Sequence, residues 1–486
     1  MITLVKAAWV IGYADGDHVI IADGQVVYED SRISFVGRDY DGPADRILDA
    51  GNAIVGPGFI DLDALADIDH ALIDCWQTPA NILRLQWSED YFHHRRRDVL
   101  PPAERDVKRE FAFCQLLRNG ITTAMSIAAE THSAWAETYD EMAAAAAIAR
   151  RLGLRTYLGP SYRCGVNVAR ADGGRDVLWD EAEGQRGFTE AVRFARDFSQ
   201  SDDDLVRACL LPCRLETLSL DIMRATAAAA RQLGCPVRVH CLQGALELQL
   251  LQEQHGRTPV ELLADTGLLD THLLIAHGIY IGGHSRNPRP YAGELETLAG
   301  AGVSVVHCPM TSLRFGSVLE SFDRYRRAGV TLALGTDSYP PDMIRNMEYG
   351  STLARWIDGR LDAGAAADFY RAATLGGAAA LRRDDLGRLA PGCLADLIVV
   401  DLDAPRVGPV DDPIRTMLMN CTGENVRTVV VNGRTVVEDG DLPGVDAADL
   451  RRRAQAHFDA MKAAYAERDY RPTEPEPLFP PSFRHL

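Results

Sequence analysis

Between about residue 57 and residue 387, segments with helical periodicity alternate with short runs of almost uniformly apolar residues. The residue after a helix often adopts the left-handed conformation, which glycine reaches without steric cost. Strands that are apolar on both faces and alternate with helices indicate a parallel sheet with crossover helices. A glycine between a helical segment and an apolar run marks this alternation at Gly120, Gly153, Gly234, Gly302 and Gly329.

The apolar runs supply eight candidate strands, which predicts a closed (β/α)8 barrel of the TIM type, in the α/β class. An open doubly wound sheet is the alternative architecture. The candidate strands are Val55–Asp61, Ile121–Ile127, Arg155–Tyr162, Val206–Cys213, Val237–Cys241, Leu273–His277, Val303–Cys308 and Thr331–Asp337.

Both ends of the chain carry the alternating pattern of antiparallel strands. Residues 1–56 and 388–440 are expected to pair into one small composite β-sandwich, with the barrel at residues 57–387. Residues 441–486 are expected to form a C-terminal helix over Ala447–Glu467 and a Pro-rich tail.

Two dipeptides predict turns in these end segments. Asn432-Gly433 stands between β-rich runs and is the strongest short-range signal of a hairpin. Asp23-Gly24 is interpreted in the same way, as a turn between two strands.

Composition and charge exclude several classes of function. The chain has 486 residues, 47% hydrophobic and 25% charged, with a formal net charge of −18 that would repel nucleic acid and anionic lipid. No apolar run is long enough to span a membrane, and the N-terminus lacks the pattern of a secretory signal. The ten cysteines are scattered, without a CxxC pair, and are expected to be free thiols. We therefore expect a cytoplasmic protein that binds neither nucleic acid nor a membrane.

Polar residues stand where several of the predicted strands end. In a barrel of this type the active site forms at the carboxyl ends of the strands. Imidazoles and carboxylates that converge from different strands suit a Zn²⁺ or similar divalent ion with open coordination positions. The residues at these ends are Asp61 and Asp63, His240, His277, His307 and Asp337.

Several motifs at these ends resemble the amidohydrolase superfamily, in particular its deaminase and chlorohydrolase branch, which includes the atrazine-degrading enzymes. The resemblance spans about residues 50–440. It implies a metal-dependent barrel with a β-sandwich built from both chain ends, a tendency to form homo-oligomers, and hydrolysis of a non-peptide C–N bond in a small polar substrate. The motifs are PGFID at Pro57–Asp61, IAHG around His277, HCP at His307–Pro309, GTDS at Gly335–Ser338 and the stretch Leu381–Asp403.

The sequence departs from this family at its first strand. Members carry a metal-binding His-x-His after the PGFID-like stretch, where this chain has Asp63 and Leu65. Leu65 cannot bind a metal, whereas Asp63 offers a carboxylate oxygen. His70, on the following loop, either replaces the missing ligand or faces solvent.

A second departure follows strand five. The catalytic glutamate of the family, three residues beyond the strand-five histidine, is Gln243 here. An amide does not exchange a proton near neutral pH, so Gln243 is expected to hydrogen-bond the substrate instead. Glu247 keeps its family position and is expected to be structural.

The remaining family residues are intact, so the resemblance implies one divalent ion, Zn or Fe, held by His240, His277, Asp337 and Asp63. His277 would bind the metal or orient the attacking water, and Asp337 would accept the water proton. The alternative that the lost ligands leave open is a metal-independent member, acting as a lyase, an isomerase or a ligand-binding pseudoenzyme.

Four further side chains are candidates for binding the substrate. An arginine at the barrel mouth can grip a carboxylate with its fork of donors, or it can pair with one of the many acidic residues of the chain. His307 is open to a structural role as well, because HCP serves packing in the family. By strand alternation Cys241 and Cys308 should face the helices as core residues. The four candidates are Arg163, Arg214, Trp76 and His307.

Overall fold

The computed structural model describes the chain except for residues 69–78, 129–132, 200–203, 474–476 and 485–486. Its centre is a parallel sheet of eight strands in the order β13-β9-β8-β6-β18-β17-β16-β15. These strands are β6 (Phe59–Ala64), β8 (Ile121–Ser126), β9 (Arg155–Leu158), β13 (Val206–Ala208), β15 (Val237–Cys241), β16 (Leu273–His277), β17 (Ser304–His307) and β18 (Thr331–Leu334).

The sheet closes on itself between its two end strands. The Leu210 N–H donates to the Pro236 carbonyl at 2.9 Å, and the Arg238 N–H donates to the Leu210 carbonyl at 3.1 Å. The predicted (β/α)8 barrel is therefore confirmed. The glycines that end its helices are left-handed as expected, with φ of 86° at Gly153 and 65° at Gly234.

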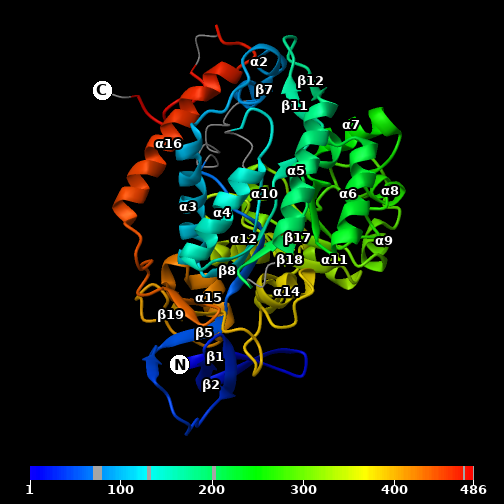
Figure 1. Cartoon of the computed structure of the whole chain (residues 1–486). Helices are drawn as coiled ribbons and strands as arrows, with labels where there is room; N and C mark the ends of the chain where they lie inside the picture. Colours follow the sequence, from blue (N-terminus) through cyan, green and yellow to red (C-terminus); the bar gives the residue numbers. More distant parts are fainter. Residues whose placement is uncertain (69–78, 129–132, 200–203, 474–476, 485–486) are drawn as a thin grey trace.

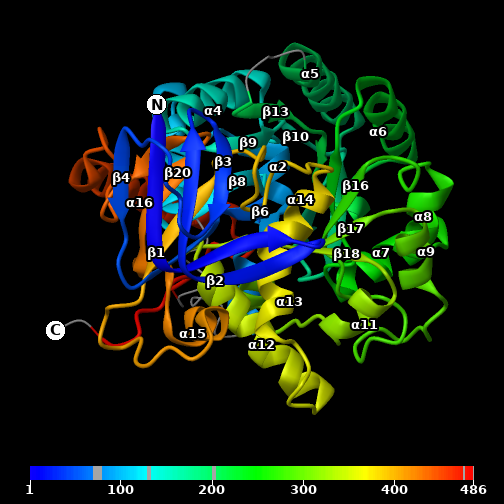
Figure 2. The same ribbon diagram turned by 90° about the horizontal axis from the view of Figure 1, so that it is seen from below.

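Helices surround the barrel (Figure 2). Their apolar faces and the outer faces of the strands share one large core, whereas Tyr157, Leu274 and Val306 belong to a separate inner cluster. The helices are α1 (Pro79–Arg84), α2 (Glu89–His94), α3 (Pro102–Arg118), α4 (Tyr139–Leu152), α5 (Glu181–Ser199), α6 (Leu220–Leu233), α7 (Ala245–His255), α8 (Pro259–Asp265), α9 (Glu294–Gly300), α10 (Pro309–Arg314), α11 (Phe322–Arg327), α12 (Met343–Asp358), α13 (Ala366–Arg371), α14 (Gly377–Ala380), α15 (Pro413–Asn420) and α16 (Ala447–Arg468).

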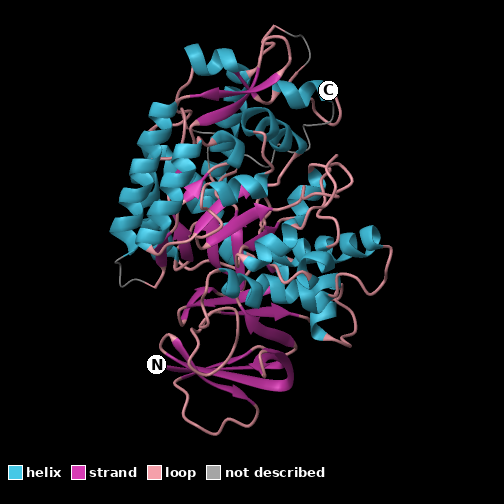
Figure 3. Cartoon of the chain, turned by 90° about the vertical axis from the view of Figure 1, so that its right-hand side faces the viewer, coloured by secondary structure: helices cyan, strands magenta, loops and turns pink. Residues whose placement is uncertain are grey.

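Residues 2–57 and 397–437 contribute strands to a second sheet, drawn below the barrel in Figure 3. Its order is β21-β20-β19-β5-β1-β2-β3, with β4 paired to β1, and it forms the β-sandwich expected from both termini. The strands are β1 (Ile2–Ala14), β2 (Asp17–Glu29), β3 (Arg32–Gly37), β4 (Arg46–Asp49), β5 (Ala53–Pro57), β19 (Leu397–Asp401), β20 (Val426–Val431) and β21 (Arg434–Val437).

The first predicted barrel strand is divided between the two sheets. β5 belongs to the sandwich and β6 to the barrel, and Gly58 lies between them. A Cβ atom at Gly58 would come within 2.2 Å of the Thr122 side chain, so only glycine fits at this crossing.

The hairpin predicted at Asn432-Gly433 is confirmed, with φ of 52° and 75° at the two residues. The turn predicted at Asp23-Gly24 is wrong, because β2 continues through it and stays paired with β1. Asp23 does have a positive φ of 50°. Gly24 is required there for space, since its Cβ would lie 2.7 Å from Val10.

A third group of elements covers the end of the barrel opposite the sandwich (Figure 1). A sheet of three strands, in the order β12-β11-β7, lies beside helix α2, and the C-terminal helix α16 packs along α3. Within the described part of the chain, the helices are all too short or too polar to cross a membrane. The strands of this group are β7 (Trp87–Ser88), β11 (Gly165–Ala169) and β12 (Arg175–Trp179), with the short parallel pair β10 (Ser161–Tyr162) and β14 (Leu211–Pro212) nearby.

Candidate functional site

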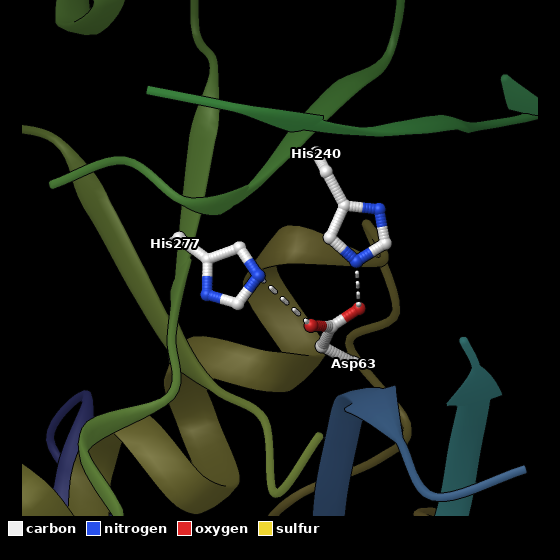
Figure 4. Close-up of side chains that lie close together, drawn as sticks. All are labelled: Asp63, His240 and His277. Carbon is white, nitrogen blue, oxygen red and sulfur yellow. Dashed lines mark ion pairs between the residues drawn. The ribbon is translucent and has the colours of Figure 1, made fainter. Parts of the chain in front are cut away.

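Three buried side chains from three barrel strands converge at the carboxyl ends of those strands (Figure 4). Nε2 of His240 lies 3.7 Å from Oδ1 of Asp63, and Nε2 of His277 lies 3.8 Å from Oδ2 of the same carboxylate. One donor atom from each residue lies within 4.8 Å of the others. The three residues therefore form a compact cluster of two imidazoles and one carboxylate.

The backbone aims the two imidazoles at this point. Nδ1 of His240 is 2.8 Å from the Cys213 carbonyl, which can only accept, so Nδ1 carries the proton and Nε2 keeps its lone pair. His277 follows Ala276 in β16 but has a φ of 73°, which re-aims its side chain at the end of the strand. Its Nε2 is buried and has no hydrogen-bond partner among the described residues.

Burial disfavours the charged form of each group in the cluster. It lowers the pKa of His277 to about 4 and the pKa of His240 well below its usual value. Burial also raises the pKa of Asp63 to about 7, although the nearby Arg238 guanidinium opposes that shift. The two imidazoles are therefore neutral at physiological pH, which is the form that binds metals.

The cluster fits a divalent metal ion. Two histidines and one carboxylate are a known donor set of catalytic zinc and of non-haem iron, with positions left open for water and substrate. Ligands bonded at about 2.0 to 2.2 Å in tetrahedral geometry lie about 3.4 Å apart, close to the two measured separations. Nε2 of His277 is buried and has no hydrogen-bond partner in the described structure, so a metal ion would satisfy it.

Arg238 is a member of the site that sequence reasoning missed. It stands two residues before His240 on β15, so its side chain shares the inner face of the barrel with that histidine. Its guanidinium is buried, forms an ion pair with Oδ1 of Asp63 and donates to the Ser126 carbonyl at 3.0 Å. The sequence could have indicated this residue, because Arg238 stands between two valines of a predicted buried strand.

Asp337 lies beside the cluster without joining it. Its backbone N–H donates to the Asp63 carbonyl at 2.7 Å. Its negative charge contributes to raising the pKa of both Asp63 and His277, so its carboxylate is close to both. Among the described residues it is not in the group whose donor atoms lie within 4.8 Å of one another.

Gln243 and Arg214 meet next to this cluster. The Arg214 guanidinium donates to Oε1 of Gln243, and Arg214 also pairs through its backbone with His240. Both carboxylate oxygens of Glu247 accept backbone N–H groups, from Leu242 at 2.7 Å and from Gln243 at 2.8 Å. Glu247 thus holds the loop after β15, which is the structural role expected for it.

Two other predicted substrate-binding residues, Arg163 and His307, are buried among aromatic rings. Arg163 is buried against the rings of Trp87 and Trp135, which favours a structural role. His307 is buried, its ring lies 6.2 Å from that of Phe322, and burial together with the nearby His277 lowers the pKa of His307 to about 3. Trp76 and His70 lie outside the described residues.

The expectation that Cys308 faces the helices is wrong. Its Sγ lies 3.5 Å from Oδ2 of Asp63 and donates a hydrogen bond to it. Alternation does not apply, because β17 ends at His307 and Cys308 is the residue that caps helix α10. Burial and the nearby Asp63 raise the pKa of this thiol well above its usual value, so it stays protonated.

Two cavities in the described part of the chain lie away from this cluster. A cavity of about 860 Å³ is lined by residues such as Gly234, His272 and Arg383, near the start of strands β15 and β16. None of the predicted site residues that the structure describes lines it, so the chemistry of the site rests on the cluster itself and not on the size of a pocket.

Comparison with known proteins gives the family. A profile described as "Amidohydrolase family" matches residues 81–436. The chain belongs to the amidohydrolase family. It is a hydrolase of the deaminase-like branch, acting on C–N bonds other than peptide bonds, as the sequence motifs predicted.

Two amidohydrolase relatives with established names are deaminases. The chain is 30% identical to 5-methylthioadenosine/S-adenosylhomocysteine deaminase of Natronomonas pharaonis, over 85% of this chain and 88% of that protein. It is 26% identical to 5'-deoxyadenosine deaminase of Methanosarcina mazei, over 95% of this chain and 98% of the relative.

Solved structures share the fold of this amidohydrolase. An adenosine deaminase from Xanthomonas campestris with bound zinc has a TM-score of 0.74 at 22% identity, over 95% of this chain and 98% of that one. A variant of atrazine chlorohydrolase from Arthrobacter aurescens, complexed with zinc and atraton, has a TM-score of 0.77 at 21% identity, over 94% and 100% of the two chains.

Proposed function

We propose that this amidohydrolase is a deaminase of a 6-aminopurine nucleoside. The observation that carries the proposal is the cluster of Asp63, His240 and His277 at the carboxyl ends of the barrel strands. The names of the relatives, which are deaminases of adenosine derivatives over most of this chain, support the choice of substrate class.

The reaction assigns a separate task to each residue. Water adds to C6 of the purine, the bond from C6 to the amino nitrogen breaks, and ammonia leaves. One water proton goes to the leaving nitrogen. The other is released to solvent, from which N1 of the 6-oxo product takes up its proton. Asp337 carries the proton from water to the leaving nitrogen, and His277 orients the water. Gln243 binds the ring, because its amide cannot transfer a proton.

The metal belongs to this proposal. Zn or Fe, held by Asp63, His240 and His277, would supply a Lewis acid that lowers the pKa of the attacking water. Asp337, beside the cluster, is the fourth predicted ligand. Arg238 supports the metal-independent alternative, since its guanidinium already balances the charge of Asp63 without an ion.

Elemental analysis distinguishes the metal-bound enzyme from the metal-independent alternative. Protein purified without chelator is expected to contain about one Zn or Fe per chain, and less in the His240→Ala and His277→Ala variants. The exposed His94→Ala variant is the matched control and should keep its metal. A value near zero that persists after soaking in Zn²⁺ or Fe²⁺ would favour the metal-independent alternative.

Ammonia release tests the activity. We expect turnover of at least one of 5'-methylthioadenosine, S-adenosylhomocysteine, 5'-deoxyadenosine and adenosine, with a matching change in ultraviolet absorbance as the 6-oxo product forms. Asp337→Asn should lower kcat/KM by at least about 100-fold, because proton transfer is lost. Metal-loaded protein that releases no ammonia from any of the four would contradict the proposed function.

A further inference from the structure

Arg214 and Gln243, which follow the nearby strands β14 and β15, form a side-chain lock beside the site. Arg214 follows β14 and Gln243 follows β15, and the Arg214 guanidinium donates a hydrogen bond to the side chain of Gln243. The backbone of Gln243 is held as well, because its N–H donates to Glu247 at 2.8 Å. Gln243 is therefore fixed at both its main chain and its amide.

This contact decides which end of the amide is left for a ligand. Arginine has donors only, so the atom of Gln243 that faces it must be the carbonyl oxygen Oε1. The remaining atom, Nε2, can only donate. A free glutamine could turn its amide over and offer an oxygen, but the guanidinium prevents that rotation here.

Both residues lie close to the reacting centre. Gln243 is three residues beyond His240, and Arg214 pairs with His240 through the backbone. The charge of Arg214 contributes to lowering the pKa of both His240 and His277, which places the guanidinium near both rings.

We propose that Arg214 is a positioning residue that holds Gln243 as a fixed hydrogen-bond donor to N1 of the purine. This inference rests on the proposed function. N1 of a 6-aminopurine carries a lone pair and accepts the bond. In the 6-oxo product N1 carries a hydrogen, and two N–H donors that face each other repel. The same lock therefore favours binding of the substrate over binding of the product.

Two adenosine analogues and two variants of Arg214 test the lock. The 7-deaza analogue of adenosine keeps N1, whereas the 1-deaza analogue replaces N1 by C–H. Arg214→Met should raise the inhibition constant of the 7-deaza analogue about tenfold, the cost of one hydrogen bond, and leave that of the 1-deaza analogue within about twofold. Arg214→Lys, which keeps a donor, should recover part of the loss.

A structural role for Arg214 predicts a different result. If Arg214 only supported the local structure, Arg214→Met would weaken the binding of both analogues by the same factor. That outcome would overturn the proposal. Arg231→Met, an exposed arginine on α6, is the control and should change neither constant. The failure of every nucleoside to bind to metal-loaded wild-type protein would instead overturn the proposed function, and with it the role given to N1.

The lock itself can be tested without any ligand. Thermal unfolding of Arg214→Met, Gln243→Met and the double variant should be non-additive, with the second substitution costing little once the first is made. Additive shifts in Tm would show that the two side chains do not hold each other, and would overturn the proposal whatever the substrate is.

Discussion

At the scale of single residues, Arg238 and Asp63 form a buried ion pair inside the barrel. Both side chains are buried, and the guanidinium reaches across the barrel from β15 to the carbonyl of Ser126 on β8. A buried pair contributes little net stability, but removing one partner leaves an uncompensated charge in a low dielectric. The pair is therefore sensitive to single substitutions.

We predict that Arg238→Met lowers the free energy of unfolding by about 3 to 5 kcal/mol in metal-free protein. The double variant Arg238→Met/Asp63→Leu should recover much of this loss, because neither charge then remains. Urea unfolding with the linear extrapolation method measures both values. A double variant that is no more stable than Arg238→Met would contradict the charge argument.

The residue scale also shows where sequence reasoning reached the site and where it stopped. His240 and His277 could be predicted because they end recognisable apolar strands. Asp63 was a weaker prediction, since β6 is irregular and its register against β8 shifts between Asp61 and Ala64. Arg238 was missed because an arginine in a strand reveals its partner only when the opposite side of the barrel is known.

At the scale of elements, the hairpin of β1 and β2 anchors the sandwich to the barrel helices through His18. Nε2 of His18 lies 2.9 Å from Oγ1 of Thr374, whose own proton goes to the Tyr370 carbonyl. Nε2 therefore carries the proton, and the buried Nδ1 has no partner within the described residues. The ring also packs edge-on against Tyr370, with the centroids 5.0 Å apart.

This anchor predicts a loss of stability in acid. Burial lowers the pKa of His18 to about 4 from 6.5, and Arg371 and Arg388 add to the shift while Asp17 opposes it. Between these two pH values the unfolded chain binds more protons, so the free energy of unfolding falls as the pH falls, by up to about 3 kcal/mol. Above pH 6.5 the contribution is constant.

The variant His18→Gln isolates this contribution. Glutamine keeps a donor for Thr374 and does not titrate, so the difference in unfolding free energy between wild type and variant should shrink from pH 7 to pH 4. Chemical denaturation at several pH values measures that difference. A difference that stays constant across the range would show that His18 titrates normally in the folded protein.

At the scale of the whole molecule, one buried ion pair joins the barrel to the sandwich. Arg155 at the start of β9 makes two contacts of 3.1 Å with Asp396, which precedes β19. Asp396 also accepts the N–H of Asn432 at 2.7 Å, in the turn of the C-terminal hairpin. Three segments that are far apart in sequence therefore depend on one carboxylate.

We predict that Asp396→Asn destabilises the whole chain by about 3 kcal/mol or more, because it leaves the Arg155 guanidinium buried without its charge partner. Scanning calorimetry should still show one transition, at a lower Tm. Disruption of the exposed pair Arg186 and Glu183 by Glu183→Gln is the control, and should change the stability by less than about 1 kcal/mol. Two separate transitions in Asp396→Asn would show that the barrel and the sandwich unfold independently.

The order of apolar and polar residues along the chain was sufficient to predict the class of fold and the strand ends that carry most of the candidate site residues. Periodicity distinguishes buried parallel strands from amphipathic helices, and a barrel places every strand end at one face. The residues at the strand ends are therefore candidates for the site from the sequence alone. The two turns predicted from Asp-Gly and Asn-Gly show the limit of local signals, because Asp23-Gly24 has the expected backbone but lies within a continuous strand.

Which side chains face one another across the molecule depends on the folding of the whole chain. Arg238 with Asp63, Arg214 with Gln243, and Arg155 with Asp396 are pairs separated by 175, 29 and 241 residues. Local patterns carry information about neighbours within a few residues, whereas these contacts depend on the closure of the barrel and on the docking of the sandwich. The charge balance and hydrogen-bonding direction of the site are set by those distant partners.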